Sequence, residues 1–170
     1  AKTPYVNTYA YGALVTYQGV GGALGKPGAS PTFSQYGDMP NNGVFIWGKT
    51  RGLRDISDGL SNTLAIGEFV HIDFEGTAAF PGSIRPWIIG GNGTPGSTSG
   101  TGTAASYAFR SIEFMLNSRV NRADDGVYFN WLPMTSHHSG RGCNFAVADG
   151  SVHFLNEDME FATYQGMATC

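Results

Sequence analysis

The chain has 170 residues with a formal net charge of −3, and only 14% of them are charged, against an average of about 25% for soluble domains. The length suits one domain, and 25 glycines with 13% aromatic residues are typical of a β-rich, loop-rich protein. The acidic balance, the scattered Lys and Arg residues and the short apolar runs argue against nucleic acid, anionic membrane surfaces and a spanning helix within this sequence.

Strand-forming segments dominate the first 70 residues. Tyr, Val and Leu residues predict strands within 1–20, and the apolar run Val44–Trp47 predicts another. The segment 21–43 is rich in Pro and Gly, so we expect a long surface excursion there. Two short apolar runs within 51–70 are separated by turn residues, which predicts a hairpin or a strand–turn–strand unit.

The middle of the chain has an unusual composition. Residues 90–106 are almost entirely Gly, Ser, Thr, Asn and Ala, and such a segment buries too little apolar surface to offset its ordering entropy. We therefore expect a flexible loop. It contains Asn92 in an Asn-Gly-Thr sequon, an acceptor for N-linked sugar in an exported protein. Residues 107–117 are apolar without a clear period and favour a strand.

The clearest local pattern is a C-terminal hairpin. The dipeptide Asp149-Gly150 lies between the runs 144–148 and 151–155, and Asp-Gly between alternating runs is the strongest short-range signal for a two-residue type I′ turn. Two-residue pairing would place four apolar side chains on one face: Phe145, Val147, Val152 and Phe154.

The segment from Glu157 to Ala168 lacks Pro and begins with acidic residues, which predicts a short C-terminal helix. Together the elements predict a mainly β fold, with an antiparallel sheet, long Gly/Ser/Thr loops and this helix. We expect one globular domain over 1–170, because no flank of the loop at 90–106 is large enough to fold alone.

The two cysteines are too few for a disulfide scaffold. Cys143 and Cys170 do not form a C-x-x-C pair, so an intrachain bridge, an interchain bridge and two free thiols are all open. A hydrolase that uses Cys143 with His137 or His138 is a catalytic alternative, since nucleophile and base need only be close in space. No nucleophile motif accompanies them, and we expect a protein that is not an enzyme.

The histidines near the C-terminal hairpin could hold a metal ion or could have simpler structural roles. Three histidines with Cys143 and Asp149 lie in one stretch, but their spacing matches no standard zinc pattern. We expect Asp149 to accept neighbouring backbone N–H groups and His138 to bond a loop carbonyl or the Asp149 carboxylate. Calcium is a second alternative, and the available carboxylates are Asp55, Asp58, Asp124, Asp125 and Glu157. They do not have EF-hand spacing, and we expect no metal and no cofactor.

Two motifs resemble the DUF1559 family of planctomycete bacteria, a prepilin-like group with a His…Asp-Gly motif near its C-terminus. The first motif, 55–68, reads DISDGLSNTLAIGE, and the second, 136–155, reads SHHSGRGCNFAVADGSVHFL. The segment 159–169 is similar to the last helix of the family. The residues that carry the resemblance are Asp55, Asp58, Gly59, Asn62, Glu68, His138, Asp149 and Gly150.

Members of that family begin with a type IV pilin-like leader and an apolar helix. The resemblance therefore implies that this chain is the β-rich head of a longer pilin-like chain. It further implies export to the cell surface or the extracellular space, with the periplasm as an alternative, and partnership with itself or other pilin-like subunits. Membrane contact would come only through the N-terminal helix, which the given sequence does not include, and no catalysis is implied.

A binding module is the main alternative. Trp47, Trp87 and Trp131 could contribute an aromatic platform near the loops 21–43 and 90–106, where carbohydrate or an envelope protein would bind. Most of these rings are expected to lie in the core or between strands.

Overall fold

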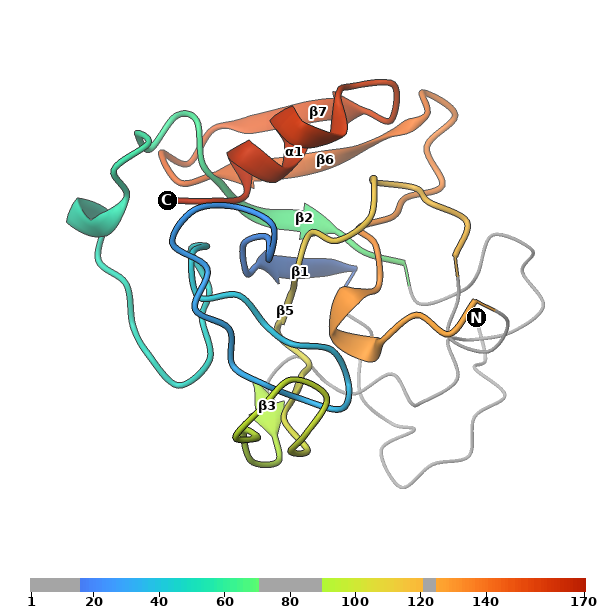
Figure 1. Ribbon diagram of the computed structural model, residues 1–170. Helices are drawn as coiled ribbons and strands as arrows, with labels where there is room; N and C mark the ends of the chain where they lie inside the picture. The colour runs from blue at the N-terminus through green and yellow to red at the C-terminus, as the bar shows by residue number, and fades with distance from the viewer. Residues whose placement is uncertain (1–15, 71–89, 121–124) are drawn as a thin grey trace.

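The computed structural model describes residues 16–70, 90–120 and 125–170, and these ranges form a mainly β protein (Figure 1). Five strands form one sheet in the order β5-β1-β2-β6-β7, and two more form a small sheet. The elements are β1 Tyr17–Val20, η1 (a 3-10 helix) Leu53–Asp55, β2 Leu64–Glu68, β3 Gly91–Asn92, β4 Ala105–Ser106, β5 Phe109–Arg110, η3 (also 3-10) Phe129–Trp131, β6 Gly142–Val147, β7 Val152–Asn156 and α1 Phe161–Met167. The predicted mainly β fold with a short C-terminal helix is confirmed. The larger sheet is mixed, because β1 and β5 run parallel while its other pairs are antiparallel.

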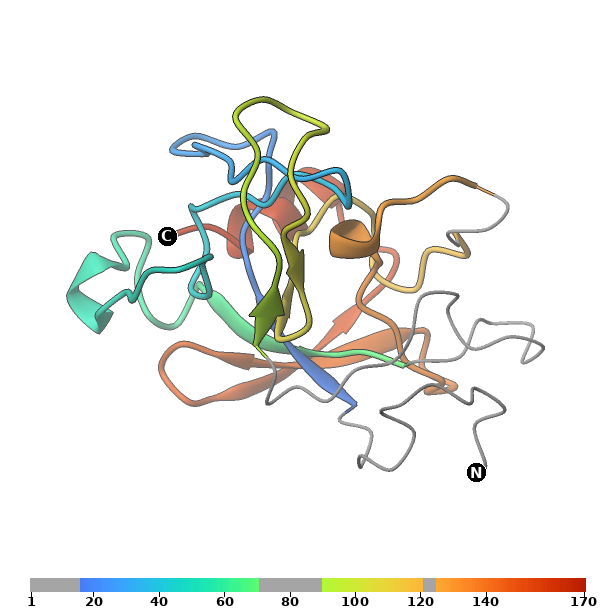
Figure 2. The ribbon, with the colours of Figure 1, turned by 90° about the horizontal axis from the view of Figure 1, so that it is seen from below.

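The core lies between the large sheet and α1, which covers one face of that sheet (Figure 2). Along β6, alternate residues point inward, so Cys143, Phe145 and Val147 are all buried. The Phe145 ring packs against the ring of Tyr164 from α1, with centroids 5.8 Å apart in a T-shaped arrangement. Since both side chains are completely buried, each contributes about 2–3 kcal/mol of transfer free energy.

The C-terminal hairpin forms, but its turn has three residues rather than two. The Gly150 N–H donates to the Val147 carbonyl at 2.9 Å, and the Val147 N–H donates to the Ser151 carbonyl at 2.9 Å. Residues 148–150 therefore make the loop. Gly150 takes a positive φ of 91° whereas Asp149 does not, which fits a type I turn followed by a glycine bulge and not a type I′ turn.

This one-residue difference reverses the faces of β7. Phe145 pairs with His153, and Asn144 pairs with Phe154. The predicted apolar face that joined Phe145 to Phe154 is therefore wrong, because a register shift of one residue turns every side chain to the opposite face. Phe154 is 47% exposed and Val152 is 66% exposed.

The unit predicted in 51–70 is only half strand. Its first arm forms the single turn η1, where the Asp55 carboxylate accepts the Gly52 N–H at 2.8 Å, and its second arm is β2. The strand expected at Val44–Trp47 does not form, and this segment runs as irregular chain. In the strand expected at 107–117, only Phe109 and Arg110 pair, as β5.

At the N-terminus, β1 confirms the end of the strand region expected in 1–20, and the rest of that region lies outside the described residues. At the other end, α1 begins at Phe161, four residues later than the acidic start we expected. Within the described ranges, no helix is long and apolar enough to cross a bilayer.

The segments expected as a surface excursion and a flexible loop are instead paired with each other. The strands β3 and β4 join through Gly91 with Ser106 and Asn92 with Ala105, and the Thr103 N–H extends the ribbon by donating to Thr94 at 2.8 Å. The ribbon continues onto the 21–43 segment, where the Gly96 N–H donates to the Phe33 carbonyl at 2.8 Å. Backbone hydrogen bonds therefore order a segment whose composition offers little apolar burial.

Buried side-chain amides complete this second region. Asn130 is 1% exposed; its Oδ1 accepts the Ser106 N–H at 3.0 Å, and its Nδ2 donates to the carbonyls of Gly37 at 2.7 Å and Ala104 at 3.2 Å. Met39 is completely buried and packs with Ala104 and Phe109. The 21–43 segment therefore contributes to a second, smaller core.

Candidate functional site

The turns of the two motifs bond each other beyond one end of β2. The Ala148 N–H at the hairpin tip donates to the Thr63 carbonyl at 2.8 Å, and the Asp149 N–H donates to the Leu60 carbonyl at 3.1 Å. The pairing continues into the sheet, where β2 and β6 run antiparallel with Leu64 opposite Val147. The two sequence motifs thus form one continuous structural unit.

The first-motif turn is closed by its own side chains. Gly59 has a φ of 93°, a conformation that L-residues with a side chain rarely adopt. The Asn62 N–H donates to the Gly59 carbonyl at 3.1 Å, and its Nδ2 donates to the Asp58 carbonyl at 3.0 Å. Asp58, Gly59 and Asn62 therefore define the loop that receives the hairpin tip.

Asp149 stabilises the hairpin turn from outside. Its Oδ1 accepts the Ser151 N–H at 2.8 Å and the Ser151 hydroxyl at 2.7 Å. These two bonds from Ser151 lower the pKa of the Asp149 carboxyl below its ordinary value. The carboxylate is a local cap for the turn, and Gly150 supplies the positive φ that follows it.

Glu68 lies near the other end of β2 and links the motifs a second time. Its Oε1 lies 2.9 Å from His138 Nε2, and its Oε2 accepts the Asn144 N–H at 2.6 Å. Burial raises the pKa of Glu68, but the bonds from Asn144 and His138 outweigh it, and the net pKa is lowered. The prediction that His138 bonds a loop carbonyl or the Asp149 carboxylate was wrong, because the strand register brings Glu68 beside its ring.

This polar cluster of Glu68, His138 and Asn144 suits a structural latch. Asn144 Nδ2 lies 3.3 Å from His138 Nε2, so the ring nitrogen that faces the carboxylate is shared by two neighbours. Among the described residues, no hydroxyl or thiol hydrogen-bonds the His138 ring, as a nucleophile activated by this histidine would.

Cys143 has the wrong environment for a nucleophile. Its side chain is completely buried in the core, and burial raises its pKa to about 12. The thiolate is the reactive form, so this thiol is inert at neutral pH. Cys170 is half-buried, burial also raises its pKa, and both residues are free thiols in the structure. The intrachain bridge, one of the three possibilities, is not formed here.

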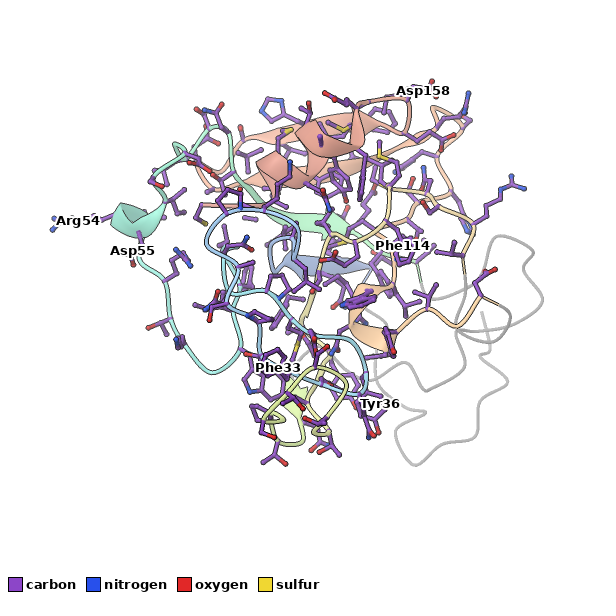
Figure 3. All side chains as sticks on the ribbon, in the orientation of Figure 1. Phe33, Tyr36, Arg54, Asp55, Phe114 and Asp158 are labelled. Carbon is purple, nitrogen blue, oxygen red and sulfur yellow. The ribbon has the colours of Figure 1, made fainter. Side chains whose placement is uncertain are left out.

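The carboxylates considered for calcium are scattered. Asp55 is bonded within η1, at the left edge of Figure 3. Glu157 directly precedes Asp158, which is labelled at the top right, and it pairs with Arg141 at 2.7 Å. Asp124 lies outside the described residues. Within the described ranges, no group of three or more His, Cys, Asp or Glu side chains is placed to hold a metal ion.

The hairpin also ends the large sheet. β7 is the last strand in the order and lies along the upper margin of the molecule (Figure 1). It presents the half-exposed Phe154 and the more exposed Val152, and its sequence from Val152 to Asn156 contains no Lys, Asp, Glu or Pro. Natural edge strands commonly carry such residues to prevent pairing with other chains.

The aromatic and sugar-acceptor candidates lie elsewhere. Trp131 is half-buried and its Nε1 donates to the Asp38 carbonyl at 2.8 Å, while its ring meets the exposed Tyr128 at 4.8 Å between centroids. Trp47 is half-buried, and Trp87 lies outside the described residues. Asn92 is exposed at the end of β3, and its glycosylation stays a prediction.

Two asparagines matter that the sequence patterns did not single out. Asn144 supplies the N–H that binds Glu68, and its place opposite that carboxylate depends on strand register. Asn117 has a φ of 58°, and its Oδ1 accepts the Ser136 N–H at 2.8 Å. Asn followed by Ser at the end of an apolar run is the available signal, since Asn tolerates the left-handed region better than other residues with side chains.

Comparison with known proteins gives one match. The model of a family described as proteins of unknown function, DUF1559, matches residues 4–162. This range contains both motifs and every strand of the structure. No curated protein and no solved structure matches the chain.

Proposed function

This chain belongs to the DUF1559 family, and we propose that it is the non-enzymatic head of an exported pilin- or pseudopilin-like subunit. In this proposal the encoded protein assembles with copies of itself or with other pilin-like subunits, at the cell surface or outside the cell. The resemblance of both motifs to a prepilin-like group supports the class of protein.

The structural observation that carries the proposal is the edge strand β7, whose outer side pairs with no other strand of the described residues. An edge strand exposes a row of backbone N–H and C=O groups that can pair with another chain. Here that strand also presents Val152 and Phe154 to solvent, next to the motif that carries the resemblance. The polar latch joins Glu68 of β2 to Asn144 of β6 and to His138, and it therefore fixes the hairpin that contains β7 to the rest of the sheet.

The interior chemistry favours a structural role over a catalytic one. Cys143 is buried with a raised pKa, and the Glu68–His138 pair bonds backbone and amide groups. Glu68 and His138 link the two motifs, and Cys143 packs in the core.

The direct test is assembly of the full-length encoded protein in its own cells. We expect Phe154→Lys to abolish its recovery in the sheared surface fraction, because a charged residue on an edge strand opposes pairing. The matched control is Leu53→Lys, which changes an equally apolar side chain that is 65% exposed in η1. That variant should assemble normally.

Recovery of Phe154→Lys at the level of the unchanged protein would contradict a role for β7. A full-length protein that remains a free periplasmic monomer would contradict the wider proposal. Thermal unfolding of the purified 170-residue chain shows whether each variant is folded.

A second candidate is a module that binds carbohydrate, and one cluster favours it. The half-buried Tyr36 and the exposed Tyr128 line a cavity of about 360 Å³, together with Gln35, and Trp131 packs against Tyr128. Ligand pockets are commonly lined by aromatic side chains with a few polar groups that fix the orientation of the ligand. Binding on a glycan array that Tyr128→Ala removes would favour this function, and an array without any signal would exclude it.

A further inference from the structure

A separate cavity of about 690 Å³ lies where the irregular segment 44–51 crosses the ends of β3 and β5. Figure 1 shows this segment as the cyan chain that leads to η1 at the left edge. The volume is within the range of sites for small organic ligands. None of the sequence motifs includes this segment, and the cavity lies apart from the latch and the edge strand.

Aromatic rings make the walls of the cavity, and glycines let them approach the backbone. Phe45 lies over Gly19 of β1, where an added Cβ would be 2.8 Å from the ring. Trp47 lies directly against Gly91 of β3, and any side chain at that position would overlap its ring. Phe109 of β5 is 6% exposed and contributes to the same cavity. These three walls are therefore apolar and closely packed against the strands.

The charged residues of the lining are both cations. Lys49 is exposed and Arg51 is half-buried, and among the described residues no Asp or Glu lines the cavity. The Arg51 guanidinium donates to two carbonyls, to Asn41 at 2.8 Å and to Asp55 at 3.3 Å. Within the described ranges, Arg51 makes no ion pair, and its Nε is buried without a hydrogen-bond partner. A buried donor of this kind costs free energy unless an acceptor reaches it.

We propose that this cavity binds a small amphipathic carboxylate, an acyl or aromatic acid with one anionic group. Its apolar body would pack against Phe45, Trp47 and Phe109. Its carboxylate would meet Lys49 and Arg51, since a guanidinium offers paired donors that match carboxylate oxygens. This inference does not depend on the proposed assembly.

The test uses a probe with and without the anion. The probe 1-anilinonaphthalene-8-sulfonate has an aromatic body and one negative charge, and N-phenyl-1-naphthylamine is the same scaffold without the charge. In fluorescence titrations of the 170-residue chain, we expect saturable binding at one site, with the anionic probe about tenfold tighter than the neutral one. Decanoate should displace the anionic probe, whereas decanol should displace it far less.

Variants assign the binding to this cavity. Lys49→Gln changes an exposed side chain and should weaken the affinity for the anionic probe about threefold. Arg51→Gln should weaken that affinity about tenfold. Neither variant should change the affinity for the neutral probe. Trp47→Ala should weaken both probes. The matched control is Arg54→Gln, because Arg54 is an exposed cation that projects away from the molecule (Figure 3) and does not line the cavity.

Three results would overturn the proposal. They are equal affinity for the two probes, unchanged affinity in both Lys49→Gln and Arg51→Gln, and a probe signal that Phe154→Ala removes while Trp47→Ala keeps it. A rise in particle size with protein concentration that decanoate reverses would instead assign the cavity to a second copy of the chain. The Lys49 variant keeps the test decisive if Trp47→Ala fails to fold.

Discussion

The C-terminal hairpin with β2 and the loop region formed by 21–43 and 90–106 are held together in different ways. In the hairpin region, alternating apolar residues of β6 such as Phe145 are buried under α1, and β6 pairs with β2 and β7 along its length. In the loop region, Gly-rich chain is ordered by backbone bonds and by buried amides such as Asn130. The difference shows that low apolar content does not require disorder when buried side chains satisfy the backbone.

The largest effect is expected from the hairpin core. Phe145→Ala should lower the free energy of unfolding by about 3–5 kcal/mol, because it opens a cavity beside Tyr164. Phe154→Ala on the paired strand should cost less than about 1 kcal/mol, since that side chain is 47% exposed. Urea unfolding measures both, and equal losses would contradict the three-residue turn and the register that follows from it.

The stability of the loop region should depend on the Asn130 amide nearly as strongly as the hairpin depends on Phe145. Asn130→Ala removes the partner of the Ser106 N–H and of two carbonyls, so we expect a loss of about 3 kcal/mol in the free energy of unfolding. Asn92→Ala, which changes an exposed amide, should stay within about 0.5 kcal/mol. If Asn130→Ala is as mild as Asn92→Ala in the same urea series, the loop region is not ordered by buried amides.

A half-buried acid bonds the backbone of the loop region and should make stability depend on pH. Glu113 accepts the Leu24 N–H at 2.9 Å, and burial raises its pKa to about 7 despite that bond. An unfolded Glu loses its proton near pH 4, so the free energy of unfolding should fall as the pH rises from about 4 to 7.

Replacing this acid tests the sign. Glu113→Gln should stabilise the protein at pH 8 by about 1–2 kcal/mol, allowing for partial exposure to solvent, and should flatten the pH dependence between 4 and 7. The exposed Glu160→Gln is the control. Thermal unfolding across that pH range would contradict the account if Glu113→Gln destabilised the protein at pH 8.

The smallest effect belongs to the latch. Glu68 has a lowered pKa in the folded state, so its contribution is present at neutral pH and is lost as the pH falls below about 4. Because His138 is half-exposed, Glu68→Gln should cost about 1 kcal/mol at pH 7 and almost nothing at pH 3. Urea midpoints at the two pH values give the comparison, and an equal cost at both would show that charge plays no part.

The sequence predicts the parts of the fold whose signals are local. The Asp149-Gly150 turn, the strand β2 at the end of the first motif and the C-terminal helix all follow from turn residues and composition. The register of β7 could not be predicted, because two- and three-residue turns with Asp-Gly share the same local pattern. The ribbon of β3 and β4 was missed because its Gly, Ser and Thr residues carry no apolar pattern, and because the segment around Phe33 that pairs with it is distant in the sequence.

The candidate site was predicted in the same uneven way. The motif residues Glu68 and His138 were identified, but their contact depends on the pairing of β2 with β6, which no local pattern shows. Lys49, Arg51 and Trp47 come together only because an irregular segment crosses two strands, and no sequence period marks it.

The most direct test of the proposed function is the mass and location of the native protein in its own cells. We measure intact mass by top-down spectrometry of the surface and periplasmic fractions, with and without reduction. The account predicts a surface protein well above the 18.1 kDa of this chain, with an apolar helix before these residues. A mature protein of 18.1 kDa found free in the periplasm would contradict it, and reduction would show whether the half-buried Cys170 bonds a partner chain.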